Sequence, residues 1–131
     1  MINNSEQKAK IVGVLFKSGS YLVVRPSSKS SWTFPAKSIH RSGKTPYIIP
    51  TLFREEYSLE VEVKDSLANF LFTKEGKETL IIANWVDCDE AEDVVIKVGE
   101  YRWVPLEEML LLTMKDEHLL IRNIIENLSF A

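Results

Sequence analysis

The hydrophobic and polar positions follow strand-like patterns through the first third of the chain. Residues 10–16 (KIVGVLF) form an apolar run rich in β-branched side chains, which predicts a buried strand. The turn sequence KSGS leads into residues 21–25 (YLVVR), so the two apolar runs predict a hairpin. After a serine-rich loop, residues 32–34 predict a short aromatic strand that Pro35 ends, and a polar, basic loop follows.

Alternation with a period of two predicts further strands in the middle of the chain. Apolar positions at 59, 61 and 63 alternate with charged ones, which predicts a half-exposed strand over residues 59–64. Residues 67–73 and 79–86 flank the turn sequence KEGK and predict an antiparallel hairpin. Residues 94–98 and 100–106 predict two more strands, separated by a glycine.

Apolar positions three and four residues apart predict helices in two places. Thr45-Pro46 suits a helix start, but Pro50 lacks an N–H, so we expect the regular helix to begin near Pro50. A helix begins at residues 107–114, and residues 115–128 predict an amphipathic helix with apolar positions 120, 121, 124, 125 and 128. The chain therefore predicts an α/β (α+β) fold in which helices sandwich a mixed β-sheet.

Length and composition are those of one ordinary globular domain. The 131 residues predict a single domain over 1–131, in which residues 1–9 are a polar N-terminal extension. The net charge of −3 gives no sign of a general nucleic-acid-binding or membrane-surface protein. A single cysteine, Cys88, excludes an internal disulfide framework and fits a reducing compartment. No run approaches the roughly 20 apolar residues of a membrane helix, and we expect a cytoplasmic protein with no membrane partner.

Three segments, in their order and spacing, resemble one known family. They are residues 21–35 (YLVVRPSSKSSWTFP), 54–59 (REEYSL) and 100–109 (EYRWVPLEEM). The resemblance is to the Nudix hydrolase superfamily and extends over residues 10–128. It implies an α/β/α sandwich with a mixed sheet, and Mg²⁺- or Mn²⁺-dependent hydrolysis of a nucleoside diphosphate joined to another group. Many relatives form dimers, so the resemblance also allows a homodimer.

The segment that resembles the family's signature departs from it at several positions. The family has a glycine, a lone glutamate, an arginine–glutamate pair, two adjacent glutamates and a final glycine. Aligned from Pro35 without a gap, the chain retains Glu55 and Glu56 of this pattern, and a one-residue slip in the loop restores no lone glutamate. The positions that differ are Lys37, Gly43, Thr51, Leu52 and Ser58. The resemblance therefore implies a degenerate Nudix signature.

The lost carboxylates matter because a hard divalent cation prefers several oxygen ligands. Positions 52 and 56 lie on one helix face, so acids at 52, 55 and 56 would form a cluster. Leu52 removes one of them and is expected to widen an apolar stripe instead. If the protein is active, Glu55 and Glu56 are the catalytic and metal-binding candidates; otherwise they form a solvated helix end. An acid from the 87–93 loop, Glu90 or Glu92, or else Glu100, could complete the site.

The candidate substrate-binding residues surround the expected mouth of the site. They are Arg25, Trp32, Lys37 and Arg41. The two arginines could contact phosphate or simply increase solubility. Trp32 could stack on a base or pack within its strand. Lys37 could be an ordinary loop lysine, or its ammonium group could pair with Glu56 in the space of the cation.

Two functions follow from these observations. The missing signature glutamates favour a non-catalytic or very weakly active Nudix-fold protein that binds a nucleotide-like ligand or a protein partner. The alternative is a divergent Mg²⁺- or Mn²⁺-dependent hydrolase of nucleoside diphosphate-linked compounds.

Overall fold

The computed structural model describes residues 8–40, 45–89 and 94–129. This part of the chain forms six strands and three helices. No helix in it is long and apolar enough to cross a membrane. In chain order the elements are β1 (Lys8–Lys17), β2 (Ser20–Arg25), β3 (Ala36–His40), α1 (Thr45–Tyr57), β4 (Glu62–Lys74), β5 (Lys77–Asp87), β6 (Glu100–Val104), α2 (Leu106–Met109) and α3 (Asp116–Ser129).

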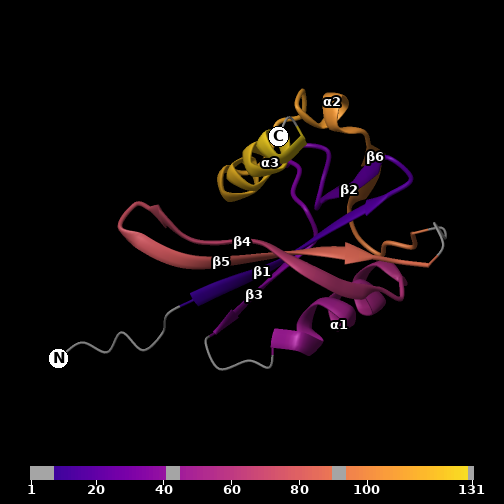
Figure 1. Ribbon diagram of the computed structural model, residues 1–131, viewed down its shortest axis with the longest axis horizontal. Coiled ribbons are helices and arrows are strands. Elements are labelled where there is room, and N and C mark those ends of the chain that lie inside the picture. The colour runs from indigo at the N-terminus through magenta and orange to yellow at the C-terminus, as the bar shows by residue number, and fades with distance from the viewer. Residues whose placement is uncertain (1–7, 41–44, 90–93, 130–131) are drawn as a thin grey trace.

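The long strand β1 lies at the centre of the sheet, in the order β4-β5-β1-β2-β6 (Figure 1). Its first half pairs with β5 in parallel and with β3 in antiparallel orientation, so Val12 lies beside both Ala83 and Ala36. Its last residues turn into β2, and β2 pairs with β6. One parallel pair among antiparallel pairs makes the sheet mixed, as predicted.

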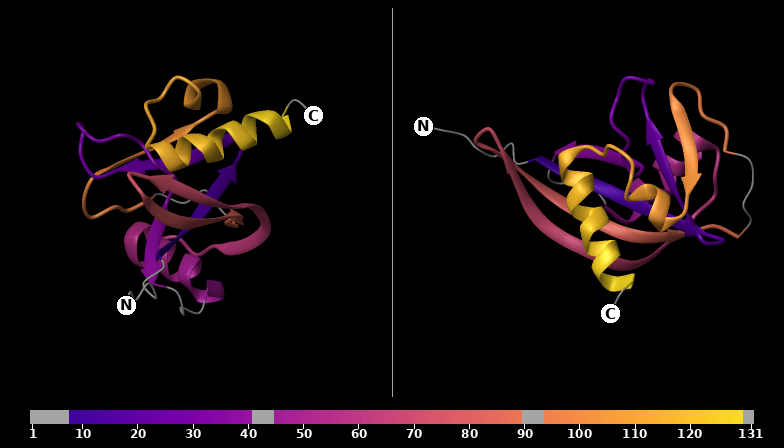
Figure 2. Two further views of the ribbon diagram at one scale, coloured as in Figure 1. Left: turned by 90° about the vertical axis from the view of Figure 1, so that its left-hand side faces the viewer. Right: turned by 90° about the horizontal axis from the view of Figure 1, so that it is seen from above.

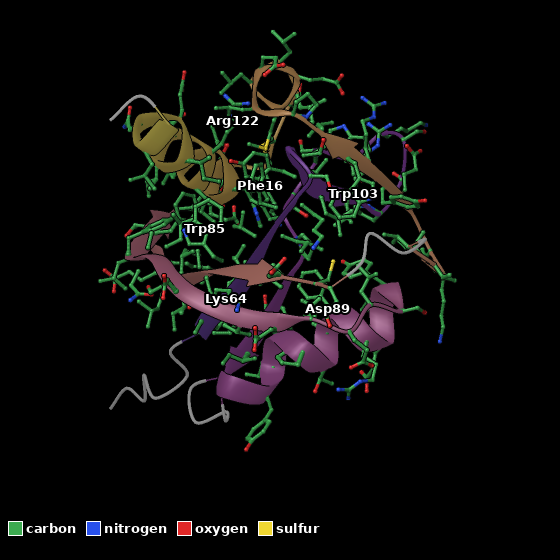
Figure 3. All side chains as sticks on the ribbon, turned by 45° about the vertical axis from the view of Figure 1, so that its right-hand side comes forward. Phe16, Lys64, Trp85, Asp89, Trp103 and Arg122 are labelled. Carbon is green, nitrogen blue, oxygen red and sulfur yellow. The ribbon has the colours of Figure 1, made fainter. Side chains whose placement is uncertain are left out.

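Helices cover both faces of the sheet, which confirms the predicted sandwich (Figures 1 and 2). Alternate β1 residues point to opposite faces. Ile11 and Leu15 join the apolar cluster beneath α1, whereas Val12 and Val14 join the cluster beneath α3. Figure 3 shows Trp85 on the α3 side of the sheet, where it packs against the second cluster.

The close contact between β1 and α1 depends on Gly13. A Cβ atom at this position would lie 2.7 Å from the Phe53 ring, 3.1 Å from Val86 and 3.2 Å from Ile49. Real Cβ atoms essentially never approach another atom as closely as the first of these distances. The missing side chain therefore lets α1 approach the sheet, with Phe53 and Ile49 buried at the interface.

The segment around Pro35 differs from its prediction. Residues 32–34 form only isolated bridges, in which Thr33 pairs with Val24 and Trp32 with Met114. The strand comes after Pro35, as β3, where a polar loop was predicted. This prediction was wrong because β3 pairs with β1 along one side only, and strand residues away from the core need not be apolar.

Two other strand predictions were wrong. The separate strands predicted at 59–64 and 67–73 form one strand, β4, whose pairing with β5 shifts between Val63 and Ala68. Such irregularities bend a strand without ending it. Residues 94–98 form no strand. There the Val95 N–H donates to the Tyr57 carbonyl at the end of α1, and the Val95 and Val98 side chains are exposed.

The helices also depart from the predicted boundaries. α1 begins at Thr45 and contains Pro50, so the expected start near Pro50 was wrong. The helix tolerates this proline while it buries Ile49, Leu52 and Phe53 against the sheet. α2 ends at Met109 instead of continuing through residue 114.

Helix α3 confirms the last predicted helix but not its whole apolar stripe. Ile121 and Ile125 are buried, whereas Leu120 and Leu128 are exposed at the edges of the stripe. At the N-terminal end of the helix the buried residues are the polar Glu117 and His118. At the other end of the chain, β1 begins at Lys8, inside the segment predicted as an extension.

Candidate functional site

A cavity of about 280 Å³ lies where the C-terminal end of α1 meets β2 and the segment before β6. One part of its wall is apolar and the other is polar, with one residue of each charge. This arrangement suits a small ligand that has both an apolar ring and hydrogen-bonding groups. The lining residues are Val24, Arg25, Pro26, Thr33, Glu56, Tyr57, Ile96 and Val98.

Arg25 is held in place on the polar wall by an acidic partner. Its Nη2 and Nε atoms donate to the same Oε1 of Glu100, at 2.8 and 3.1 Å. The pairing of β2 with β6 places these two residues directly opposite each other. Gly99 makes this approach possible, because its φ is +96° and a Cβ there would lie 2.4 Å from the Arg25 carbonyl oxygen. Glu100 therefore both orients Arg25 and balances its charge.

Trp32 lies behind Arg25 and does not line the cavity. Only 5% of the residue is exposed, and its ring joins the core beneath α3. The Arg25 guanidinium carbon lies 4.2 Å from a ring centroid of Trp32, and that of Arg102 lies 5.2 Å away. These contacts are cation–π interactions that stabilise both arginines. Trp32 thus positions Arg25, and its predicted role in stacking on a base stays a prediction.

The two adjacent glutamates at the end of α1 lie differently. Both are exposed, but Glu56 lines the cavity and Glu55 does not. The neighbouring Tyr57 is buried, and burial, followed by the negative charge of Glu56, raises its pKa to about 12. Tyr57 is therefore a neutral wall residue at physiological pH. The helix ends immediately afterwards at Ser58, whose φ is +56°.

Leu52 is part of the core beneath α1. It is 7% exposed and packs in the same apolar cluster as Ile49 and Phe53. This confirms that Leu52 widens the apolar stripe of α1, at the position where a carboxylate would complete a cluster with Glu56.

The fold resembles that of several solved structures. The E. coli ORF135 protein is 14% identical with a TM-score of 0.79, and the match covers 98% of this chain and 95% of that one. The MutT protein from Methanosarcina mazei Go1 is 19% identical with a TM-score of 0.76, over 98% and 96% of the two chains. The MutT Nudix hydrolase from Burkholderia pseudomallei is 10% identical with a TM-score of 0.74, over 91% and 98%. The chain has the Nudix fold.

The sequence itself matches no protein-family model and no curated protein. Identities of 10–19% with structures that share the fold establish the Nudix architecture and not the chemistry. The functional question therefore depends on the residues that this Nudix-fold chain presents at the end of α1.

These residues do not fit a divalent cation. Within residues 8–40, 45–89 and 94–129, no three His, Cys, Asp or Glu residues come together as a metal site. Glu56 is the one carboxylate on the cavity wall, and Glu100 is paired with Arg25. Because Mg²⁺ and Mn²⁺ prefer several oxygen ligands, a lone exposed carboxylate is a poor site for them. The predicted metal roles of Glu55 and Glu56 stay predictions.

The other predicted site residues are not brought to the cavity by the described chain. Lys37 lies exposed on β3 opposite Ile11 and makes no ion pair with Glu56 or any other described residue. Arg41, Glu90 and Glu92 lie outside the described residues. Their predicted roles in substrate or metal binding are therefore not tested.

Sequence reasoning missed most of the apolar wall of the cavity. Ile96 and Val98 come from the segment taken for a strand, and Tyr57 was read only as part of the helix end. One signal could have helped: two predicted neighbouring strands, 21–25 and 100–106, end and begin with residues of opposite charge. That pattern is typical of a cross-strand ion pair such as Arg25–Glu100.

Proposed function

We propose that this protein is a non-catalytic Nudix-fold domain that binds a nucleotide-like small molecule in the cavity at the end of α1. The observation that carries the proposal is the burial of Leu52 in the core. Where a metal-dependent diphosphate hydrolase needs clustered acids to neutralise developing charge, this chain has an apolar contact. The helix face that would hold the cation serves to attach α1 to the sheet.

The chemistry of the cavity supports a bound ligand of modest charge. Val24, Ile96 and Val98 offer an apolar surface for a ring, while Thr33 and Glu56 offer hydrogen-bonding groups for hydroxyls or ring nitrogens. Arg25 is already matched by Glu100, so it adds orientation more than net positive charge. A nucleoside-like moiety suits these walls, and a bare diphosphate does not.

The second candidate is a weak metal-dependent hydrolase of nucleoside diphosphate-linked compounds. Glu56 favours it, because this carboxylate still faces the cavity at the end of the signature-like helix. It predicts Mg²⁺- or Mn²⁺-dependent turnover that Glu56→Gln abolishes.

Binding can be tested without metal by NMR titration with nucleosides, nucleoside diphosphates and nucleoside diphosphate sugars. We expect saturable amide shifts at residues of the cavity, such as Thr33 and Tyr57. Val98→Arg fills the mouth and should weaken binding at least about tenfold, by steric exclusion. Val95→Arg is the matched control, since Val95 is also exposed, at 58%, but does not line the cavity.

Equal weakening by both variants, or no saturable shift with any of these compounds, would contradict the proposal. Turnover of a bound compound in Mg²⁺ or Mn²⁺ would replace it with the hydrolase.

A further inference from the structure

A second cavity, also of about 280 Å³, lies between the start of β1, the turn between β4 and β5, and the start of α3. Its lining holds five lysines and only two acids, in a chain whose 16 basic residues are outnumbered by 19 acidic ones. We name it the lysine cavity; its five lysines are Lys8, Lys10, Lys74, Lys77 and Lys115.

The fold gathers these lysines from segments far apart in the sequence. Lys8 and Lys10 are two residues apart on β1 and therefore point to the same face. Lys74 and Lys77 lie directly opposite each other across the β4–β5 turn. Like charges in that position repel, so local pairing does not explain their presence. A bound anion between the strands would turn this repulsion into attraction.

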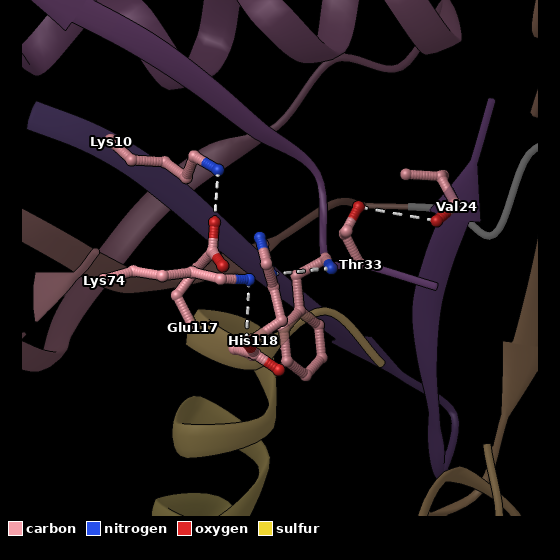
Figure 4. Close-up of polar contacts among 8 residues, drawn as sticks. Lys10, Val24, Thr33, Lys74, Glu117 and His118 are labelled. Atoms are coloured by element: carbon pink, nitrogen blue, oxygen red, sulfur yellow. Dashed lines mark hydrogen bonds and ion pairs between the residues drawn. The ribbon is translucent and has the colours of Figure 1, made fainter. Parts of the chain in front are cut away.

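Two of the five lysines have acidic partners. The Lys10 ammonium lies 2.6 Å from Glu117 Oε2, and these side chains are only 16% and 9% exposed (Figure 4). Burial alone would raise the pKa of Glu117, but the hydrogen bond and charge of Lys10 keep it below its ordinary value. The pair is thus a fixed, charged part of the wall. Lys74 pairs with Asp116 at 3.0 Å, at the exposed rim.

The remaining three lysines give the cavity an excess of positive charge. Lys8, Lys77 and Lys115 make no ion pair with any residue that the structure describes. Lys115 directly precedes α3, whose first-turn amides carry the partial positive charge of a helix N-terminus. Three ammonium groups and a helix N-terminus therefore surround one concave space.

We propose that the lysine cavity binds a small molecule through a di- or triphosphate group. Lysine ammonium groups bind phosphate as point charges from several directions, whereas a planar carboxylate is better matched by the fork of an arginine. A cavity near the lower limit of ligand-pocket size suits one such group and not an extended chain. The negative charge of the whole protein opposes a nucleic acid lying across its surface. This site does not depend on the ligand proposed for the cavity at α1.

The test uses inorganic tripolyphosphate as the probe, in an NMR titration of the whole chain without metal. We expect saturable shifts at the amides of Lys8, Lys77 and Lys115, and affinity that falls steeply with added salt. The double variant Lys8→Ala/Lys77→Ala should weaken binding about tenfold or more, because it removes two charged contacts. Thermal unfolding of the variant confirms that it is folded.

The matched control is Lys29→Ala/Lys97→Ala, which removes the same net charge from two exposed lysines outside the cavity. We expect this control to bind tripolyphosphate within about twofold of the unmodified protein, since distant exposed charges are screened by salt. Equal weakening by both double variants would show a general charge effect and overturn the proposal. So would the absence of saturable shifts, or tighter binding of a single-stranded oligonucleotide through the same lysines.

Discussion

Leu52→Glu is the most informative single substitution, because it returns a carboxylate to the position where the Nudix signature has one. If Leu52 belongs to the core, as its 7% exposure indicates, the change must destabilise the protein. Losing the buried methyl groups costs about 1.5–3 kcal/mol. Keeping the new carboxyl group in an apolar contact raises its pKa, and each unit of that rise costs about 1.4 kcal/mol at neutral pH. The free energy of unfolding should therefore fall by about 4 kcal/mol, a large part of the 5–15 kcal/mol of a typical domain.

Urea denaturation followed by circular dichroism, with and without Mg²⁺, measures this effect. The loss should be smaller in mild acid than at neutral pH, because the new carboxyl is then protonated in the unfolded state as well. Leu52→Met keeps the volume and should cost less than about 1.5 kcal/mol. Leu111→Glu is the matched control: Leu111 is 85% exposed, so its substitution should change stability by less than about 0.5 kcal/mol. A Leu52→Glu protein as stable as the original, and further stabilised by Mg²⁺, would refute the assignment of Leu52 to the core.

Three further substitutions test the packing, the pH dependence and the helix end. Gly13→Ala should destabilise the protein by about 1–3 kcal/mol in urea denaturation, because its methyl group would collide with Phe53; unchanged stability would show that α1 is not closely packed on β1. Burial, with the charge of Lys10, lowers the pKa of His118 to about 3, so the unfolded chain binds a proton that the folded one does not as pH falls below about 6.5. Stability should drop by about 2 kcal/mol between pH 7 and pH 5 and much less in His118→Gln, and equal slopes for the two proteins would contradict this. Ser58→Gly should raise the stability by about 0.5–1 kcal/mol in thermal unfolding, since φ is +56°, whereas Ser66→Gly within β4 should lower it; a loss at position 58 would be the contrary result.

The pH prediction for His118 can be separated from other titrations. The Phe34 N–H donates to Nδ1 of His118 at 3.1 Å, so the buried imidazole is neutral and accepts this bond (Figure 4). Glu117 has a lowered pKa and affects stability only below its ordinary value near 4.5. The interval between about pH 5 and pH 7 therefore reports mainly on His118.

The fold was largely predictable because its central elements bury one face or both. β1, β2, the β4–β5 hairpin and α3 all carry the apolar spacing of their secondary structure, and each was predicted within a few residues. β3 was missed because its sequence, AKSIH, is mostly polar. The opposite error came from residues 94–98, where an apolar run forms part of a cavity wall instead of a strand. Hydrophobicity reports burial or ligand contact, and only regular spacing distinguishes a strand.

The candidate site was predictable only where it lies in the signature-like segment. Glu56 and Arg25 line the cavity, as their place in the resemblance implied, and Leu52 lies in the core. The lysine cavity was not predicted at all. Its walls come from Lys8 and Lys115, more than a hundred residues apart, and only the packing of α3 on the sheet brings such residues together.

The most direct test of the loss of catalysis is a hydrolysis screen of the purified protein over nucleoside diphosphate-linked compounds, with Mg²⁺ and with Mn²⁺. Glu55→Gln and Glu56→Gln proteins run beside it and detect any contaminating activity. A non-catalytic domain gives no turnover above the level of these two variants. Metal-dependent turnover that both variants lose would contradict the proposal and show that the remaining pair of glutamates is enough for catalysis.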